Sequence, residues 1–162
     1  MVTDDRVIGF EPFVPNDSWV LILGSFPSVR SRQNSFYYGN PQNRFWGILA
    51  DAFDEPVPLT LQEKKNLLTC HHIALWDIVA ECNIRGSMDA DIRNPVIADI
   101  ESLLQHTNIS HIITNGKTAH DLTVKNFPTL KDKIIPLSST SPANTRLNRN
   151  QWIDVIQDLC KV

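Results

Sequence analysis

The sequence predicts a three-layer α/β/α domain built on a central parallel sheet of about four strands. Four short apolar runs have the length of buried strands, and they alternate with segments whose apolar residues recur at helical spacing. Strands that alternate with helices pair in parallel, and helices then cover both faces of the sheet. With 162 residues and 42% hydrophobic content, we expect a single domain spanning residues 1–162.

The four apolar runs are the expected strands of this sheet. In chain order they are Trp19–Leu23, Ile73–Trp76, Ile109–Ile113 and Lys133–Leu137. Each run is too short for a buried helix, and three of the four are rich in valine or isoleucine, which favour strands.

Four other segments have the spacing of amphipathic helices. The residues that share a helical face are Phe45, Leu49, Ala52 and Phe53; Leu61, Leu67 and Leu68; Val96, Ile100, Leu103 and Leu104; and Trp152, Val155, Ile156 and Leu159. Thr60 followed by Glu63 forms a capping box, which predicts the start of the second helix.

Proline and glycine mark the expected helix ends. Pro41 and Pro95 stand where helices would begin, and Pro56 and Pro58 stand just after the end of the first helix. The pair Asn115-Gly116 follows the third strand and is expected to open a further helix.

Cysteine usage and hydropathy exclude several classes of protein. Cys70, Cys82 and Cys160 are odd in number, far apart and in no CxxC arrangement, so we expect reduced thiols without disulfide, zinc or iron–sulfur cluster. No apolar run approaches the ~20 residues of a membrane-spanning helix. The acidic segment 1–6 lacks the pattern of a signal peptide. We expect a cytoplasmic, monomeric protein with no metal, cofactor or membrane contact.

The net charge of −3 is unevenly distributed along the chain. Residues 18–50 contain Arg30, Arg32 and Arg44 and no acid, and residues 133–153 contain Lys133, Arg146 and Arg149 and no acid. If the two segments meet in the fold, they provide a basic face that could attract a polyanion to an acidic protein.

Three loops leave the carboxyl ends of the predicted strands and therefore share one edge of the sheet. They are Gly24–Asn43, Asn115-Gly116 and Ser138–Asn144. The first and third are rich in hydroxyl and amide groups and contain no Asp, Glu, His or Cys, so neither offers the base of a catalytic triad or a set of metal ligands. The chain contains neither GxxxxGK[ST] nor GxGxxG. Neutral amides and an aromatic side chain suit the binding of a flat, uncharged ring such as a nucleobase.

The segments Gly24–Ser28, Tyr37–Trp46 and Ser139–Asn144 together resemble the uracil-DNA glycosylase superfamily. Within it, the hypoxanthine-DNA (deoxyinosine) glycosylase branch is the most similar, and Trp76-Asp77, Cys82 and Ile84–Asp89 also resemble that branch. The resemblance extends over Phe10 to Asn144 and implies a uracil-DNA glycosylase-like fold. It also implies DNA containing a deaminated base as partner and hydrolysis of the N-glycosidic bond of a flipped base. The two main loops contain no lysine, so we expect no Schiff-base lyase activity.

The resemblance also implies roles for individual residues. Phe26 occupies the position of the water-orienting Asn of a related branch, and the catalytic amide corresponds to Asn43. Tyr38 corresponds to the aromatic residue that stacks on the base. The residues expected to bind the base are Ser25, Phe26, Tyr38, Asn40 and Asn115. Those expected to bind DNA are Ser139, Ser141, Asn144 and Arg146.

Two departures from the family pattern leave the substrate open. Asn40 replaces a usual His, and Leu137-Ser138-Ser139 replaces Leu-Pro-Ser. A glycosylase acting on uracil or xanthine, a binding module without catalysis and a hydrolase of free nucleosides remain alternatives. Asn43 could cap a helix instead. For Asp77 we favour capping or bracing of a loop over catalysis.

Overall fold

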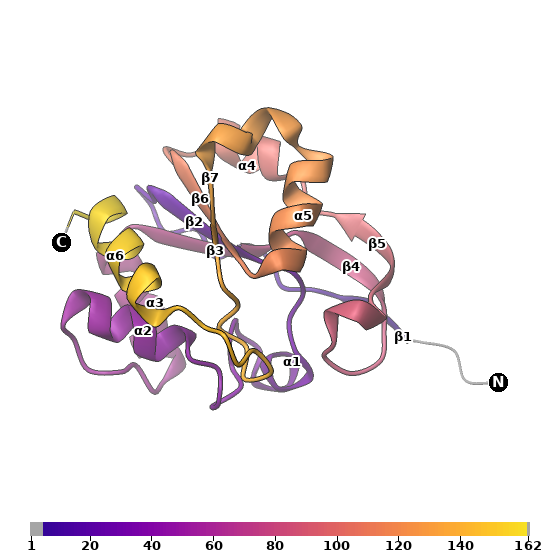
Figure 1. Cartoon of the computed structure of the whole chain (residues 1–162), viewed down its shortest axis with the longest axis horizontal. Helices are drawn as coiled ribbons and strands as arrows, with labels where there is room; N and C mark the ends of the chain where they lie inside the picture. The colour runs from indigo at the N-terminus through magenta and orange to yellow at the C-terminus, as the bar shows by residue number, and fades with distance from the viewer. Residues whose placement is uncertain (1–4, 162) are drawn as a thin grey trace.

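The computed structural model describes residues 5–161 (Figure 1). In chain order its elements are β1 (Asp5–Ile8), β2 (Val20–Gly24), α1 (Val29–Asn34), α2 (Phe45–Phe53), α3 (Leu61–Cys70), β3 (Ile73–Asp77), β4 (Val79–Ile84), η1 (Asp89–Asp91), β5 (Arg93–Ile97), α4 (Ile100–Gln105), β6 (His111–Asn115), α5 (Lys117–Asn126), η2 (Pro128–Lys133), β7 (Ile134–Leu137) and α6 (Arg149–Leu159).

The predicted parallel sheet of four strands is confirmed, in the order β3-β2-β6-β7. Val20 of β2 aligns with Ile73 of β3 on one side and with His111 of β6 on the other. All five residues of β2 are buried, as expected for a strand with a neighbour on each edge and helices on both faces. The third strand starts at His111 rather than Ile109, because its register with β2 begins there.

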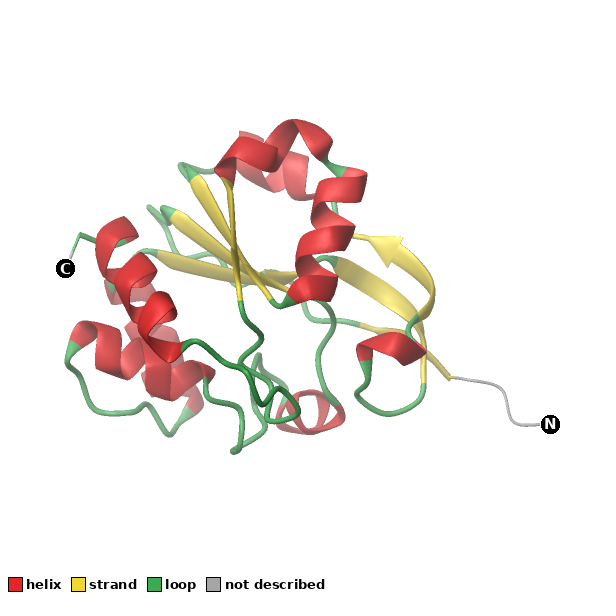
Figure 2. Cartoon of the chain, viewed as in Figure 1, coloured by secondary structure: helices red, strands yellow, loops and turns green. Residues whose placement is uncertain are grey.

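Helices cover both faces of the sheet, which completes the three layers (Figure 2). One face carries the side chains of Val20 and Ile22, which pack with residues of α2, α3 and α6. The opposite face carries Leu21 and Leu23, which pack with residues around α4 and α5. The alternation of side chains along a strand therefore divides the core into two clusters, one on each side of the sheet.

A second, antiparallel sheet was not predicted. It has the strand order β1-β4-β5, with Ile8 of β1 aligned with Glu81 of β4. The prediction that Val96 begins a helical face and that Pro95 starts a helix is wrong, since both lie in β5. Pro95 is tolerated there because β5 is an edge strand, and α4 begins after Asp99, whose side chain accepts a hydrogen bond from the Ser102 N–H.

The other predicted helices are present with small differences at their ends. The capping box of Thr60 and Glu63 is confirmed at the start of α3. The first helix begins at Phe45, so Pro41 lies in the preceding turn instead of at the helix start. The short α1 inside the first loop was not predicted, and Ser28 caps it.

The strand order creates a crevice between β2 and β6 at their carboxyl ends. The chain leaves β2 through α2 and α3 on one face of the sheet and leaves β6 through α5 on the other. In open α/β sheets, ligands bind where neighbouring strands send their connections in opposite directions. The fold therefore places its candidate site at this crevice.

Candidate active site

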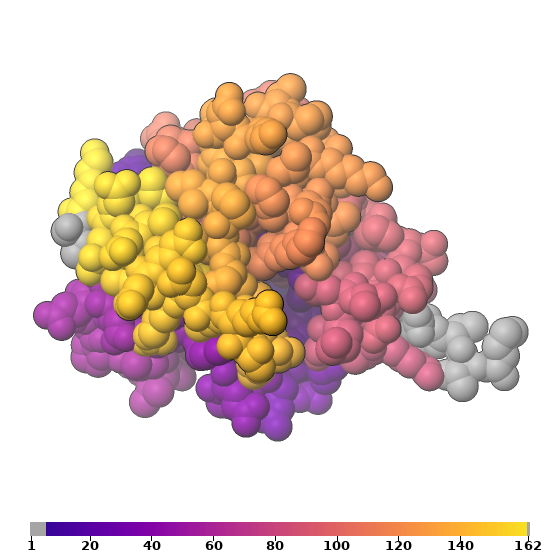
Figure 3. Space-filling view, viewed as in Figure 1, coloured from indigo at the N-terminus to yellow at the C-terminus, as the bar shows by residue number. Residues whose placement is uncertain are grey.

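A hollow opens on the molecular surface beside the carboxyl end of the sheet (Figure 3). The loop after β2 lies at its bottom, and its sides are formed by the 84–91 segment, the start of α5 and the loop after β7. The three loops predicted to share one edge of the sheet are thus brought together, with a fourth segment beside them.

Tyr38 is held in the left-handed region, with a φ of 52°. Its ring stacks on Phe45 at a centroid distance of 4.1 Å, and its carbonyl oxygen accepts a hydrogen bond from Trp46 Nε1 at 3.1 Å. Phe45 and Trp46 are buried, as predicted for core residues. The start of α2 therefore fixes the expected stacking residue.

Asn43 precedes Arg44, the N-cap residue of α2, and its Oδ1 accepts a hydrogen bond from the Phe45 N–H at 2.9 Å. Its Nδ2 makes no hydrogen bond among residues 5–161. Asn40 also bonds locally, with its Oδ1 accepting from the Gln42 N–H. Asn40 and Asn43 line a second hollow, of about 570 Å³, whose other lining residues include Leu61 and Lys64 of α3. Asn43 therefore bonds to the backbone at the helix start without being the N-cap residue, and the donor end of its amide stays available.

Arg44 joins the first loop to the loop after β7. Its guanidinium donates to the carbonyl oxygens of Thr140, Ser141 and Asn144, and its backbone N–H donates to Thr140 O at 3.2 Å. Because the Arg44 guanidinium is already hydrogen-bonded to three carbonyl oxygens, its role is to hold the two loops together and not to contact a phosphate. The two acid-free segments of the sequence therefore meet, which was the condition set for a basic face.

The loop after β7 is shaped by its own hydrogen bonds. Ser139 Oγ accepts from the Ser141 N–H, and Ser141 Oγ accepts from the Ala143 N–H. Asn144 Nδ2 donates to Ser139 O at 2.8 Å, and Asn144 Oδ1 accepts from the Arg146 N–H. These bonds preform a compact projection at the rim of the hollow.

Asn115 links the end of β6 to this projection. Its Nδ2 donates to Thr140 Oγ1 and its Oδ1 accepts from the Thr140 N–H, both at 3.0 Å. A carboxamide can make four hydrogen bonds, so each end retains one position for a base edge. Gly116 follows with a φ of 97°, and a methyl group there would lie 3.1 Å from Ser139 Cβ. Glycine is needed here for both the conformation and the close approach.

Ser25 and Phe26 directly follow β2, at the carboxyl end of the sheet. The Phe26 ring is partly buried against the second core cluster. Ser25 Oγ donates to Asp89 Oδ1 at 2.6 Å. The first loop contains no acid, but the connection between β4 and β5 brings this exposed carboxylate to it. Sequence reasoning noted Asp89 only within a family-like segment, since its 64-residue separation from Ser25 conceals the contact.

Asp77 ends β3 directly beside Gly24 of β2 and is only 5% exposed. Burial, followed by the charge of Asp89, raises the pKa of its carboxyl from 3.8 to about 7. Asp77 Oδ2 and Tyr38 Oη are buried, and neither has a hydrogen-bond partner among the described residues. The favoured capping or bracing role gains no support from Oδ2, which has no hydrogen-bond partner among residues 5–161.

The cations around the site differ in availability. Arg32 donates to Gly86 O at 2.7 Å, and Arg149 pairs with Asp51. The side chains of Arg30 and Arg146 are exposed, and within the part of the chain that the structure describes they form no ion pair or hydrogen bond. These two arginines can therefore contact a phosphate without breaking an existing interaction.

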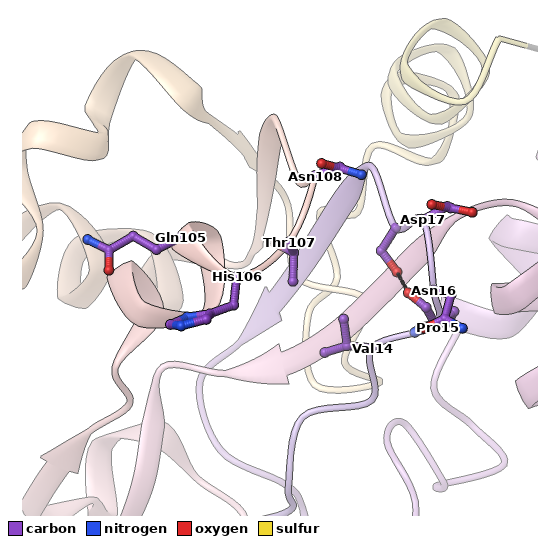
Figure 4. A pocket seen from close by; sticks show the side chains of 9 residues that line it. Val14, Pro15, Asn16, Asp17, Gln105, His106, Thr107 and Asn108 are labelled. Carbon is purple, nitrogen blue, oxygen red and sulfur yellow. Dashed lines mark hydrogen bonds between the residues drawn. The ribbon is translucent and has the colours of Figure 1, made fainter.

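A separate hollow of about 440 Å³ lies at the opposite end of the sheet (Figure 4). It is lined by residues 14–18 and 105–108, which precede β2 and β6. None of the predicted site residues borders it. Over residues 5–161, no cluster of three or more His, Cys, Asp or Glu side chains could hold a metal ion, and no helix is long and apolar enough to span a membrane.

Comparison with known proteins agrees with this arrangement. Residues 11–160 match the family described as the uracil DNA glycosylase superfamily. A hypoxanthine DNA glycosylase of Methanosarcina acetivorans is 34% identical over 151 residues, covering 88% of this chain and 91% of the relative. One of Methanosarcina barkeri is 31% identical over 111 residues, covering 67% and 70%.

A solved structure shares the fold over nearly its whole length. The solution NMR structure of a candidate uracil DNA glycosylase from Methanosarcina acetivorans superimposes with a TM-score of 0.81 at 29% identity, covering 96% of this chain and 99% of that one. The family match covers the two loops and the strand ends that form the hollow. The chain belongs to the uracil DNA glycosylase superfamily.

Proposed function

We propose that this protein is a monofunctional DNA glycosylase that hydrolyses the N-glycosidic bond of hypoxanthine flipped out of DNA. The observation that carries the proposal is the set of hydrogen bonds from Arg44 to the loop after β7. These bonds hold the Tyr38–Asn43 segment against that loop at the crevice. The names of the two Methanosarcina relatives support hypoxanthine as the base. A monomer and a cytoplasmic location belong to the same proposal.

Within this function, Tyr38 stacks on the extruded base, and Asn115 offers its remaining hydrogen-bonding positions to the base edge. Ser25, Phe26 and Asn40 complete the pocket. The free Nδ2 of Asn43 stabilises negative charge on the departing base or holds the attacking water. Ser139, Ser141 and Asn144 form the projection that enters the DNA, and Arg146 contacts a phosphate.

The experiment measures abasic-site formation in duplexes that contain hypoxanthine, uracil or xanthine. Wild-type protein is expected to release hypoxanthine fastest. Asn43→Ala should lower the single-turnover rate by ~10²-fold or more, because one positioned donor is lost. Asn43→Ser retains an oxygen that can accept from the Phe45 N–H. If this variant loses as much activity as Asn43→Ala, the loss comes from the missing amide donor and not from the missing hydrogen bond to Phe45.

Asn108→Ala is the matched control, since Asn108 is exposed and lies at the opposite end of the sheet from the loops. Duplex binding should change little in all three variants. Full activity of both Asn43 variants would refute the catalytic role of the amide. Retention of duplex without release of any base would identify a binding module instead.

A further inference from the structure

Gly24 and Asp77 are paired neighbours at the ends of two parallel strands, and the missing side chain of Gly24 lets the Asp77 carboxyl lie close against the Gly24 backbone. A methyl group on Gly24 would lie 2.5 Å from Asp77 Oδ1 and 3.1 Å from Tyr38 Oη. The carboxyl of Asp77 and the phenol of Tyr38 therefore face the same point. This point adjoins the residue that begins the expected base pocket, Ser25.

The two buried atoms without partners, Asp77 Oδ2 and Tyr38 Oη, belong to these same two side chains. Buried polar atoms in native proteins are nearly always hydrogen-bonded, and exceptions call for an explanation such as catalysis or a bound molecule. Their position at the crevice, next to a stacking residue, points to a polar atom of the substrate as the absent partner.

The groups around Asp77 favour a neutral carboxyl. Burial and then the charge of Asp77 raise the pKa of Tyr38, against a smaller lowering by the Asn115 side chain, and burial raises the pKa of Tyr37, so both phenols remain neutral. From the 84–91 segment, Asp89 adds a negative charge that disfavours ionisation of Asp77. Asn115 of β6 is uncharged. No cation offsets these effects among the groups that the described residues place against Asp77.

We propose that Asp77 is a further catalytic residue, the acid that gives its proton to the departing base; this inference rests on the proposed function. As the bond from C1′ to the base nitrogen breaks, its electron pair passes to the base. The carboxylic proton of Asp77 moves to a heteroatom of that base. Water adds its oxygen to C1′ and releases one proton, which restores the Asp77 carboxyl. The products are an abasic sugar and the neutral base.

The ring of Tyr38 positions the base relative to the Asp77 carboxyl. A base stacked on this ring brings its edge toward Asp77 Oδ2, the carboxyl oxygen that has no partner among the described residues. A general acid works best when its pKa lies near the working pH, because it must be both protonated and able to donate. A carboxyl titrating near pH 7 satisfies both conditions, whereas an exposed aspartic acid is ionised there.

The test is the single-turnover rate of hypoxanthine release from pH 5.5 to 9, with the intact protein in excess over duplex. For wild type, the rate should fall as pH rises through about 7. Asp77→Asn should be slower by ~10²–10⁴-fold at pH 6 and lose this pH dependence. Asp89→Asn should move the wild-type midpoint to lower pH, because the charge that raises the pKa of Asp77 is removed.

The outcomes separate this inference from the proposed function. If wild type releases no base from any duplex, the proposed function itself fails. If wild type is active and Asp77→Asn retains its rate and pH profile, only the role of Asp77 is refuted. Should Asp77→Asn fail to fold, an unchanged midpoint in Asp89→Asn would overturn the proposal, and a downward shift would support it.

Discussion

Replacing Asp77 by Asn should make the folded protein more stable at neutral pH. The pKa of Asp77 rises from 3.8 to about 7 on folding. Since one pKa unit corresponds to ~1.4 kcal/mol, ionising this buried carboxyl costs the folded state up to ~4 kcal/mol above pH 7. Asn has nearly the same shape and carries no charge, so the variant avoids this cost.

The direction in which wild-type stability changes with pH follows from proton binding. Between pH 4 and 7, the folded protein keeps the proton of Asp77 while the unfolded chain has lost it, so folding takes up a proton. Wild-type stability therefore falls as pH rises through this window, by at most ~1.4 kcal/mol per pH unit from this group, and the contribution becomes constant above 7. The variant lacks the contribution at every pH.

Urea unfolding followed by tryptophan fluorescence from pH 5 to 8 measures the effect. The difference in unfolding free energy between Asp77→Asn and wild type cancels the titration of all other groups. It should grow in favour of the variant up to pH 7 and then level off. Asp132→Asn, at an exposed position, is the control and should give a flat difference. A flat difference for Asp77→Asn as well would show that Asp77 is already ionised in the folded protein.

Two further substitutions test how the loops are held. Arg44→Lys should lower base release more than it lowers duplex binding and reduce the free energy of unfolding by ~2 kcal/mol, because a single ammonium cannot replace the fork that binds three carbonyl oxygens. Glycosylase assays and urea unfolding measure both effects, and an unchanged ratio of release to binding would contradict this role. Gly116→Ala should destabilise more than Gly86→Ala. Both residues have positive φ, but only at Gly116 would a methyl group meet another residue, Ser139, so similar losses in urea would argue against the close approach.

Much of the fold followed from local patterns. Period and length predicted the four central strands, and apolar spacing predicted α2, α3 and α6. A capping box depends on side chains three residues apart, so Thr60 and Glu63 could be interpreted without knowing the fold. The second sheet could not be predicted in this way. Its strands pair over long sequence separations, as Ile8 with Glu81, and Pro95 resembles a helix start until its place on a sheet edge is known.

Some residues of the site could likewise be predicted from the sequence, and others could not. The amides, hydroxyls and aromatic rings of the loops after β2 and β7 are contiguous along the chain, so residue type and spacing predicted a base pocket containing Tyr38 and Asn43. The placement of the acids could not be foreseen. Asp89 reaches Ser25, and Asp77 lies beside Gly24, only because β3 and β4 run next to the end of β2.

The protonation of Asp77 depends on that placement most of all. A sequence states that a carboxyl is present, but its pKa is set by how much water surrounds it and which charges lie near it. Those quantities come from strand pairing and packing. The sequence therefore specifies the sheet, the helices and the loops that carry the family pattern, while the folded structure specifies which carboxyl is neutral, because burial is a property of the whole molecule.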